Sequence, residues 1–137
     1  MAVNNGNHSH QLIIHSSPYA PAQILEKLKK IFQEKEITIF ALIDHSGEAQ
    51  RAGLDLKYER LLIFGDPSTG TYLMQENPAI GIELPLKILL WQDAKGVAQI
   101  AYKDPKYFVE VYGIKKNAII LQKMSGALAL IIDQVNS

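Results

Sequence analysis

The sequence contains no cysteine among its 137 residues. This absence excludes disulfide bonds, thiol catalysis, iron–sulfur ligation and every zinc site that requires a cysteine ligand. An excess of one charge is also missing, because 14 basic side chains are balanced by 14 acidic ones. A neutral chain has no strong overall field that attracts nucleic acid or an anionic membrane. The lack of cysteine suits the reducing cytoplasm, where we expect the protein to reside.

Long hydrophobic runs are missing as well. The most apolar run, Ala127 to Ile132, falls far short of the roughly 20 residues that a membrane span needs. Residues 1–9 are rich in asparagine and lack the basic start and apolar centre of a secretory signal. We therefore predict no membrane segment, a flexible tail over residues 1–9 and one domain over residues 10–137. An apolar fraction of 47% is enough for a globular core in a chain of this length.

Five segments have the composition and alternation of β-strands. They cover residues 11–16, 37–43, 60–64, 86–92 and 97–102. Segment 37–43 is apolar at both alternating sets of positions, so we predict a central strand that is covered on both faces. Asp93 and Gly96 bracket a type I turn between the last two strands, which predicts an antiparallel hairpin.

Helical patterns occupy the segments around these strands. The first helix follows an expected cap at Ser17, and its apolar residues recur at the spacing of one helical face. Further helices are predicted over about 47–52, from Asp66 to about 75, and from Asp104 to about 113. The last helix, about 117–135, is apolar on most of its circumference and needs cover from the sheet or from a second subunit.

The element order is therefore β-α-β-α-β-α-β-β-α-α. Helices between strands favour right-handed crossovers, whereas the hairpin is antiparallel. We predict a single compact α+β domain with a mixed, mostly antiparallel curved sheet of about five strands and packed helices.

Four segments of the chain carry a family resemblance: FALIDHSGEAQRAGL, LLIFGDPSTGTYLMQENP, IELPLKILLWQDAKG and AYKDPKYF. In this order and spacing they resemble the prokaryotic family catalogued as domain of unknown function 302, from about Gln11 to Val135. The resemblance implies a compact α+β fold similar to the TATA-binding-protein-like arrangement of a curved sheet with packed helices. It implies no activity, substrate or cofactor. Asp66 and Lys103 each stand where the family pattern has asparagine.

Asp44, His45 and Ser46 have the side chains of a hydrolase triad. Consecutive residues at a strand end point in different directions, however, and the Gly-x-Ser-x-Gly elbow that exposes a nucleophile is missing. We interpret Asp44 or Ser46 as the cap of the following short helix. His45 stands at a strand end, and the imidazole group is a common general acid–base and ligand contact in such places. We therefore keep His45 as a candidate general acid–base or ligand-binding residue, with Asp44 or a distant carboxylate as its partner.

The segment Gly65 to Thr71 has some features of a phosphate-binding loop. Free amides at a helix start attract anions, and Ser68, Thr69 and Thr71 could add hydroxyl groups. The segment lacks the Gly-x-x-x-x-Gly-Lys pattern and contains no lysine, and Asp66 places a negative charge at the cap. We interpret it as a self-capped helix, with Ser68, Thr69 and Thr71 as ligand-binding candidates.

Two other candidates concern metals and aromatic contacts. His8 and His10 could hold a transition metal, but they lie in the predicted tail without a carboxylate beside them, which favours adventitious binding. We therefore predict no native metal and no cofactor. Trp91 is a candidate for the floor of a ligand pocket, a role that large aromatic rings often have.

Three functional hypotheses follow from these patterns. The first is a non-catalytic module that binds a small ligand or a protein partner, with a homodimer formed through the last helix or a sheet edge. The second is an enzyme of hydrolase or isomerase type that uses His45 as general acid or base. The third, suggested only by fold analogy, is a sequence-independent nucleic-acid binder. We favour the first, because recognisable catalytic patterns are missing.

Overall fold

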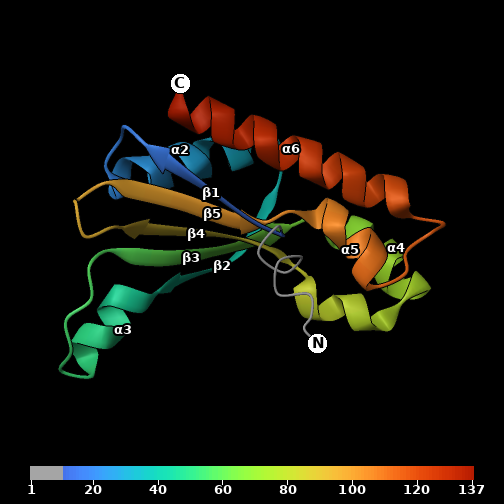
Figure 1. Cartoon of the computed structure of the whole chain (residues 1–137), viewed down its shortest axis with the longest axis horizontal. Coiled ribbons are helices and arrows are strands. Elements are labelled where there is room, and N and C mark those ends of the chain that lie inside the picture. Colours follow the sequence, from blue (N-terminus) through green and yellow to red (C-terminus); the bar gives the residue numbers. More distant parts are fainter. Residues whose placement is uncertain (1–10) are drawn as a thin grey trace.

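The computed structural model describes residues 11–137, and residues 1–10 lie outside the described part (Figure 1). The predicted tail and the His8/His10 pair therefore fall outside it. The elements are β1 (Leu12–Ser17), α2 (Pro21–Glu34), β2 (Thr38–Asp44), α3 (His45–Arg51), β3 (Glu59–Gly65), α4 (Pro67–Glu76), η1 (Pro78–Glu83), β4 (Leu86–Gln92), β5 (Ala98–Lys103), η2 (Pro105–Tyr107), α5 (Phe108–Val111) and α6 (Ala118–Asn136).

The five strands form one sheet in the order β1-β5-β4-β3-β2. The predicted α+β class and the five strands are confirmed. All four neighbouring pairs are antiparallel, so the sheet lacks the parallel pair that we expected from the crossovers. The reason is that α3 and α4 lie within connections between antiparallel neighbours. A parallel crossover must return along the strand, and the seven residues of α3 are too few for that. Only α2 carries the chain from one edge of the sheet to the other.

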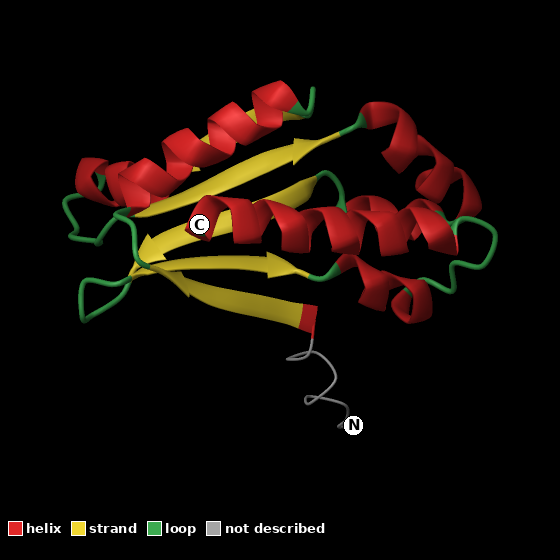
Figure 2. Ribbon diagram, turned by 90° about the horizontal axis from the view of Figure 1, so that it is seen from above, coloured by secondary structure: helices red, strands yellow, loops and turns green. Residues whose placement is uncertain are grey.

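Two helices cover one face of this sheet (Figure 2). The buried side chains of α2 and α6 meet those of the central strands, and the rings of Phe32 and Phe64 lie 4.6 Å apart. A smaller core fills the end of the molecule where α4, α5 and the start of α6 meet. Its buried members are Leu73, Ile80, Phe108, Ile114 and Leu121.

Strand β2 differs from the prediction. We expected a central strand covered on both faces, but β2 is an edge strand, and most of its side chains are exposed. Ile39, Phe40, Leu42 and Ile43 each keep between 36% and 46% of their surface in contact with solvent. In this chain, therefore, the segment that is apolar at both alternating sets of positions is an exposed edge strand and not a buried central strand.

The helix starts agree with the predicted caps at two aspartates and differ at one serine. Asp66 and Asp104 accept hydrogen bonds from the amides of Ser68 and Lys106, as the Asp-Pro pattern predicted. Ser17 does not cap α2, because the helix begins three residues later than Pro18. Ala20 is the N-cap, and its amide donates to Gln23 Oε1.

Helix α6 has 19 residues and by length and composition alone could cross a membrane. Five of its side chains, those of Leu121, Leu128, Ile131, Ile132 and Val135, are buried against the rest of the domain, which amounts to 28% of its most apolar 18 residues.

Replacing leucine by alanine distinguishes buried apolar positions from exposed ones. Leu62 on β3 is fully buried, whereas Leu130 on α6 is 62% exposed. We expect Leu62→Ala to lower the free energy of unfolding by about 3 kcal/mol, because it leaves a cavity in the core. Leu130→Ala should change it by less than about 1 kcal/mol. Urea denaturation followed by circular dichroism measures both, and equal losses would contradict the assignment of the core.

Candidate functional site

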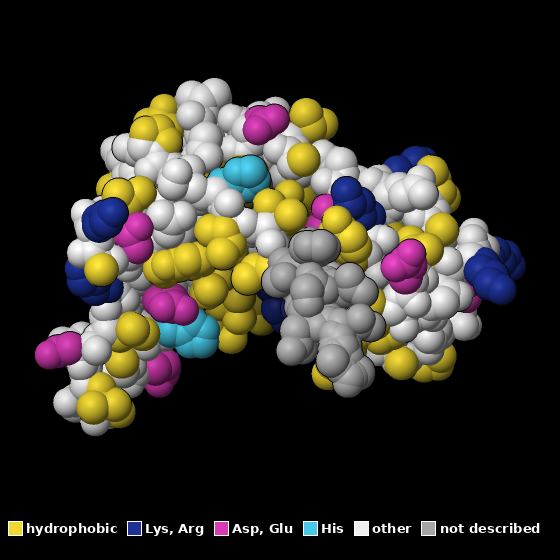
Figure 3. Space-filling model, in the orientation of Figure 1, with side chains coloured by type: hydrophobic (Ala, Val, Ile, Leu, Met, Phe, Trp, Pro, Cys, Tyr) yellow, Lys and Arg dark blue, Asp and Glu magenta, His cyan; other side chains and the backbone are white. Residues whose placement is uncertain are grey.

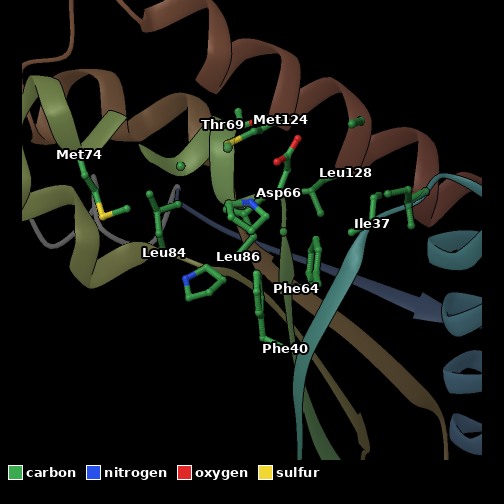
Figure 4. Close-up of a pocket in the computed structure, with 16 residues that line it drawn as sticks. Ile37, Phe40, Phe64, Asp66, Thr69, Met74, Leu84, Leu86, Met124 and Leu128 are labelled. Atoms are coloured by element: carbon green, nitrogen blue, oxygen red, sulfur yellow. The ribbon is translucent and has the colours of Figure 1, made fainter. Parts of the chain in front are cut away.

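A cavity of about 260 Å³ lies at the end of the sheet where β2 and β3 approach α4 and α6 (Figure 4). We call it the end cavity. Side chains from the sheet, including Phe40 and Phe64, face Met124 and Leu128 from α6. Its lining consists of Ile37, Phe40, Phe64, Gly65, Asp66, Pro67, Thr69, Gly70, Met74, Leu84, Pro85, Leu86, Met124, Ala127, Leu128 and Ile131.

Among residues 11–137, only Asp66 and Thr69 bring polar side chains to the end cavity. Asp66 Oδ1 accepts hydrogen bonds from the amide and the hydroxyl of Ser68, at 3.0 and 2.7 Å. The hydroxyl bond is the main cause of a pKa below the ordinary range for the Asp66 carboxyl, with the amide bond acting in the same direction. Asp66 is therefore a carboxylate at neutral pH, and it repels anions from this part of the cavity.

A second hollow, of about 310 Å³, lies on the face of the sheet opposite α2 and α6. We call it the sheet-face groove. Leu61, Leu89, Trp91 and Ala101 contribute to its lining from three neighbouring strands, and Leu12, Ile82, Glu83, Leu86, Lys87, Tyr102, Lys103 and Phe108 complete it. Figure 3 shows hydrophobic side chains gathered over the middle of the molecule, in a hollow between α3 and the opposite end.

The charged side chains of the groove cluster around Glu83. Lys103 Nζ lies 3.2 Å from Glu83 Oε1, and the Tyr112 hydroxyl donates to Glu83 Oε2 at 2.6 Å. Lys87 Nζ donates to the carbonyl oxygens of Pro85 and Glu83, at 2.8 and 3.5 Å. Burial lowers the pKa of Lys87, and Lys103 adds to this, while Glu83 opposes it.

Asp44 and Ser46 belong to a third, polar cluster with Arg60. Asp44 Oδ1 accepts from the Gly47 amide at 2.7 Å and lies 2.6 Å from Arg60 Nη1. The amide bond is the main cause of the lowered pKa of Asp44. Ser46 Oγ donates to Asp44 Oδ1 and accepts from Arg60 Nη1. Asp44 is therefore the helix cap that the sequence predicted, and its charge is already paired.

His45 does not join this cluster. Its side chain is exposed, and it lines neither the end cavity, the sheet-face groove nor the hollow beside Arg60. Within residues 11–137, no three histidine, aspartate or glutamate side chains lie close enough together to hold a metal ion.

The other predicted candidates are separated from one another. Thr69 lines the end cavity and Trp91 lines the sheet-face groove. Ser68 is occupied with Asp66, and the Thr71 hydroxyl donates to the Pro67 carbonyl at 2.7 Å. The structure thus does not bring the candidates together in one site.

Sequence reasoning missed most of the residues that line the two hollows. They are apolar, such as Phe40 and Leu84, or are lysines without a motif, such as Lys87. The predicted turn, bracketed by Asp93 and Gly96, would have placed Lys87 opposite Tyr102. The observed register differs by one residue, with Gln92 opposite Ala98, and this places Lys87 beside Lys103.

Comparisons with known proteins give a consistent family match. The family model described as "Domain of unknown function DUF302" matches residues 13–134. A crystal structure of an uncharacterized conserved protein DUF302 from Bacillus stearothermophilus superposes with a TM-score of 0.80 at 18% identity, covering 91% of this chain and 98% of that one. At this identity the structural likeness shows the fold alone.

Curated relatives with a different name match as well. The chain is 30% identical over 117 residues to the fluoride-specific ion channel FluC 1 of Brucella suis biovar 1, a match that covers 84% of this chain and 46% of that protein. The fluoride-specific ion channel FluC 1 of Brucella abortus biovar 1 matches at the same identity over 43% of its length. The chain thus spans less than half the length of the curated relatives it matches.

The Tyr112 hydroxyl provides a test of the Glu83 cluster. Burial, together with the hydrogen bond to Glu83, raises the pKa of Tyr112 to about 12. An unfolded tyrosine ionises near pH 10, so the stability that Tyr112 contributes is complete below about pH 10 and is lost as the pH rises towards its folded pKa. We expect the difference in phenolate absorbance between wild type and Tyr112→Phe to titrate with a pKa of about 12. A midpoint near 10 would show that the hydroxyl is free.

Proposed function

Because the chain belongs to the family described as domain of unknown function DUF302, whose name specifies no reaction, we propose a function from the geometry of the hollows. We propose that the domain is a non-catalytic module that binds a small, largely apolar molecule in the end cavity.

The composition of the cavity lining carries this proposal. Of its 16 lining residues, only Asp66 and Thr69 have polar side chains. Ligand sites for small molecules have this character, with mostly apolar walls and a few polar groups that fix the orientation of the ligand. Removal of the apolar walls of the cavity from water by an apolar ligand is also favourable.

The two polar groups restrict the chemistry of the ligand. The Asp66 carboxylate accepts hydrogen bonds, whereas the Thr69 hydroxyl can donate or accept. A neutral or cationic head group that donates a hydrogen bond is therefore compatible with the cavity, and an anionic head group is disfavoured. Alcohols and amines with an aliphatic or aromatic body are the ligand class we infer.

The relatives named as fluoride-specific ion channels are compatible with a module of this kind. Each has at least as much chain again beyond the segment that resembles this protein. The Bacillus stearothermophilus chain, by contrast, is matched over 98% of its length. The domain thus makes up nearly all of one chain and less than half of others. A domain that occurs in both settings is suited to a binding role that different proteins can use.

Gly70 offers a direct test of the end cavity. A Cβ atom there would lie 3.6 Å from Leu84 Cδ1 and 4.0 Å from Met74 Cε, so larger side chains extend into the cavity. A Cβ atom added to Gly126 in α6 would meet no other atom within 4 Å, so this glycine serves as the matched control.

We expect 1-octanol to bind the wild-type protein, and Gly70→Val to weaken this binding by roughly tenfold, because the added methyl groups occupy the space of one or two ligand methylenes. Gly126→Val should bind octanol as the wild type does. Isothermal titration calorimetry measures the affinities, and octanoate should bind this cavity more weakly than octanol. Octanol binding that is absent, or is equal in the two variants, would contradict the proposal.

We further propose that two copies of the chain associate through β2. Within residues 11–137, the outer edge of β2 has no neighbouring strand, and β2 has no lysine or proline to discourage pairing. An antiparallel pair of identical strands is self-complementary and obeys two-fold symmetry. Phe40 lies on β2 and also lines the end cavity, so a second copy would cover one wall of the ligand site.

Two lysine substitutions separate the sheet edge from the last helix as the route to a dimer. Ile43→Lys places a charge in the exposed edge and should convert a dimer into a monomer, because pairing would bury that charge. Leu130→Lys on the exposed side of α6 should leave the dimer intact. Light scattering after size exclusion, over a wide range of concentration, measures the mass. A wild-type monomer throughout would rule out self-association, and dissociation by Leu130→Lys alone would place the interface on α6.

A further inference from the structure

The sheet-face groove combines an apolar floor with positive charge at one end. Leu61, Leu89 and Trp91 project from β3 and β4 on the face that α2 and α6 leave uncovered. The side chains are only partly buried, although they are among the most apolar in the chain. Burying such a floor under an apolar group stabilises the complex by roughly 25 cal/mol for each Å² removed from water.

The charge comes from two lysines on neighbouring strands. Leu89 on β4 pairs with Ala101 on β5, so the same antiparallel register places Lys87 beside Lys103 on the same face. Both lysines line the groove. Like charges that face each other across two strands destabilise a sheet. A negatively charged group between the two lysines would therefore stabilise this pair.

The protein itself supplies only part of the negative charge that would balance the two lysines. Glu83 is the acidic residue of the groove lining, and its carboxylate is shared between Lys103 and the Tyr112 hydroxyl. Lys87 donates only to backbone carbonyl oxygens of the described residues, and these carry no net charge. Two ammonium groups and one carboxylate leave one positive charge uncompensated at the edge of an apolar floor.

We propose that the sheet-face groove binds an amphipathic carboxylate, a small molecule with one carboxylate head group and an unbranched or aromatic apolar tail. The carboxylate lies at Lys87 and Lys103, and the tail lies on Leu61, Leu89 and Trp91. One negative charge neutralises the site, because the groove carries one net positive charge. The third ammonium hydrogen of Lys87 has no partner among residues 11–137. It donates a charge-assisted hydrogen bond to the ligand carboxylate.

This ligand differs from that of the end cavity in the sign of its head group. Asp66 disfavours anions at the end cavity, whereas the lysines favour them at the groove. The two sites therefore accept different classes of amphiphile, and the groove proposal does not depend on the end cavity.

Trp91 makes the groove directly observable. It is the only tryptophan in the sequence, and it lines the groove but not the end cavity. A ligand tail placed on its indole ring excludes water and shifts its fluorescence emission to shorter wavelength. Emission from Trp91 thus reports on the groove, and binding at the end cavity leaves it unchanged.

The experiment titrates the full chain with decanoate and follows Trp91 emission. We expect a saturable blue shift, and binding at least about tenfold tighter than that of hexanoate because four further methylenes reach the apolar floor. Decyltrimethylammonium, which has the same tail and the opposite charge, should cause no saturable shift below its micelle concentration.

Substitution of the lysines tests the role of their charge. Lys87→Met and Lys103→Met should each weaken decanoate binding by about tenfold, because each removes a charged donor to the carboxylate. Lys123→Met makes the same charge change on α6, on the other side of the sheet, and should leave the affinity unchanged. Gly70→Val, which fills the end cavity, should leave it unchanged as well. Thermal unfolding of each variant checks that it is folded.

Three results would overturn the proposal. The first is the lack of a Trp91 shift with decanoate at any concentration below its micelle formation. The second is equal affinity in Lys87→Met, Lys103→Met and Lys123→Met, which would indicate that the head group does not meet the lysines. The third is equal binding of decyltrimethylammonium, which would indicate a purely apolar contact.

Discussion

The structure depends on one constraint: a five-stranded sheet with apolar side chains on both faces has two long helices on only one of them. Burial of α2 and α6 against that face forms the main core and holds the strands in register. The opposite face and the β2 edge keep their apolar side chains without an equivalent cover in residues 11–137. The end cavity, the sheet-face groove and the exposed edge all lie where this single helical layer ends or is missing.

The course of α2 explains which edge is exposed. The helix carries the chain across the whole sheet, so β1 and β2 become its two edges although only α2 separates them in sequence. The later strands then fill the space between them as antiparallel neighbours. Among the described strands, β2 thus pairs with β3 alone, so its outer edge is unpaired, and Phe40 on the same strand lines the end cavity.

Local signals in the sequence predicted most of the fold. Asp66-Pro67 and Asp104-Pro105 marked helix starts because their carboxylates cap free amides, and those interactions involve only near neighbours. The place of β2 could not be predicted in this way. An apolar residue at every position is equally suited to a buried central strand and to an edge that awaits a partner. Which of the two occurs is decided by the path of the chain outside this strand.

The candidate sites were less predictable than the fold. Thr69 and Trp91 were identified from their chemistry, but the structure assigns them to different hollows. Lys87 and Lys103 are 16 positions apart and lie in no recognisable motif, and only strand register brings them together.

Helix α3 has a different relation to the domain from the other helices, because none of its side chains is buried. It extends from the sheet between β2 and β3, and the contacts of Asp44, Ser46 and Arg60 attach its first turn. A segment of this kind can open and close while the rest of the domain stays folded. Its amides should therefore exchange with solvent by local opening, without unfolding of the sheet and the two long helices.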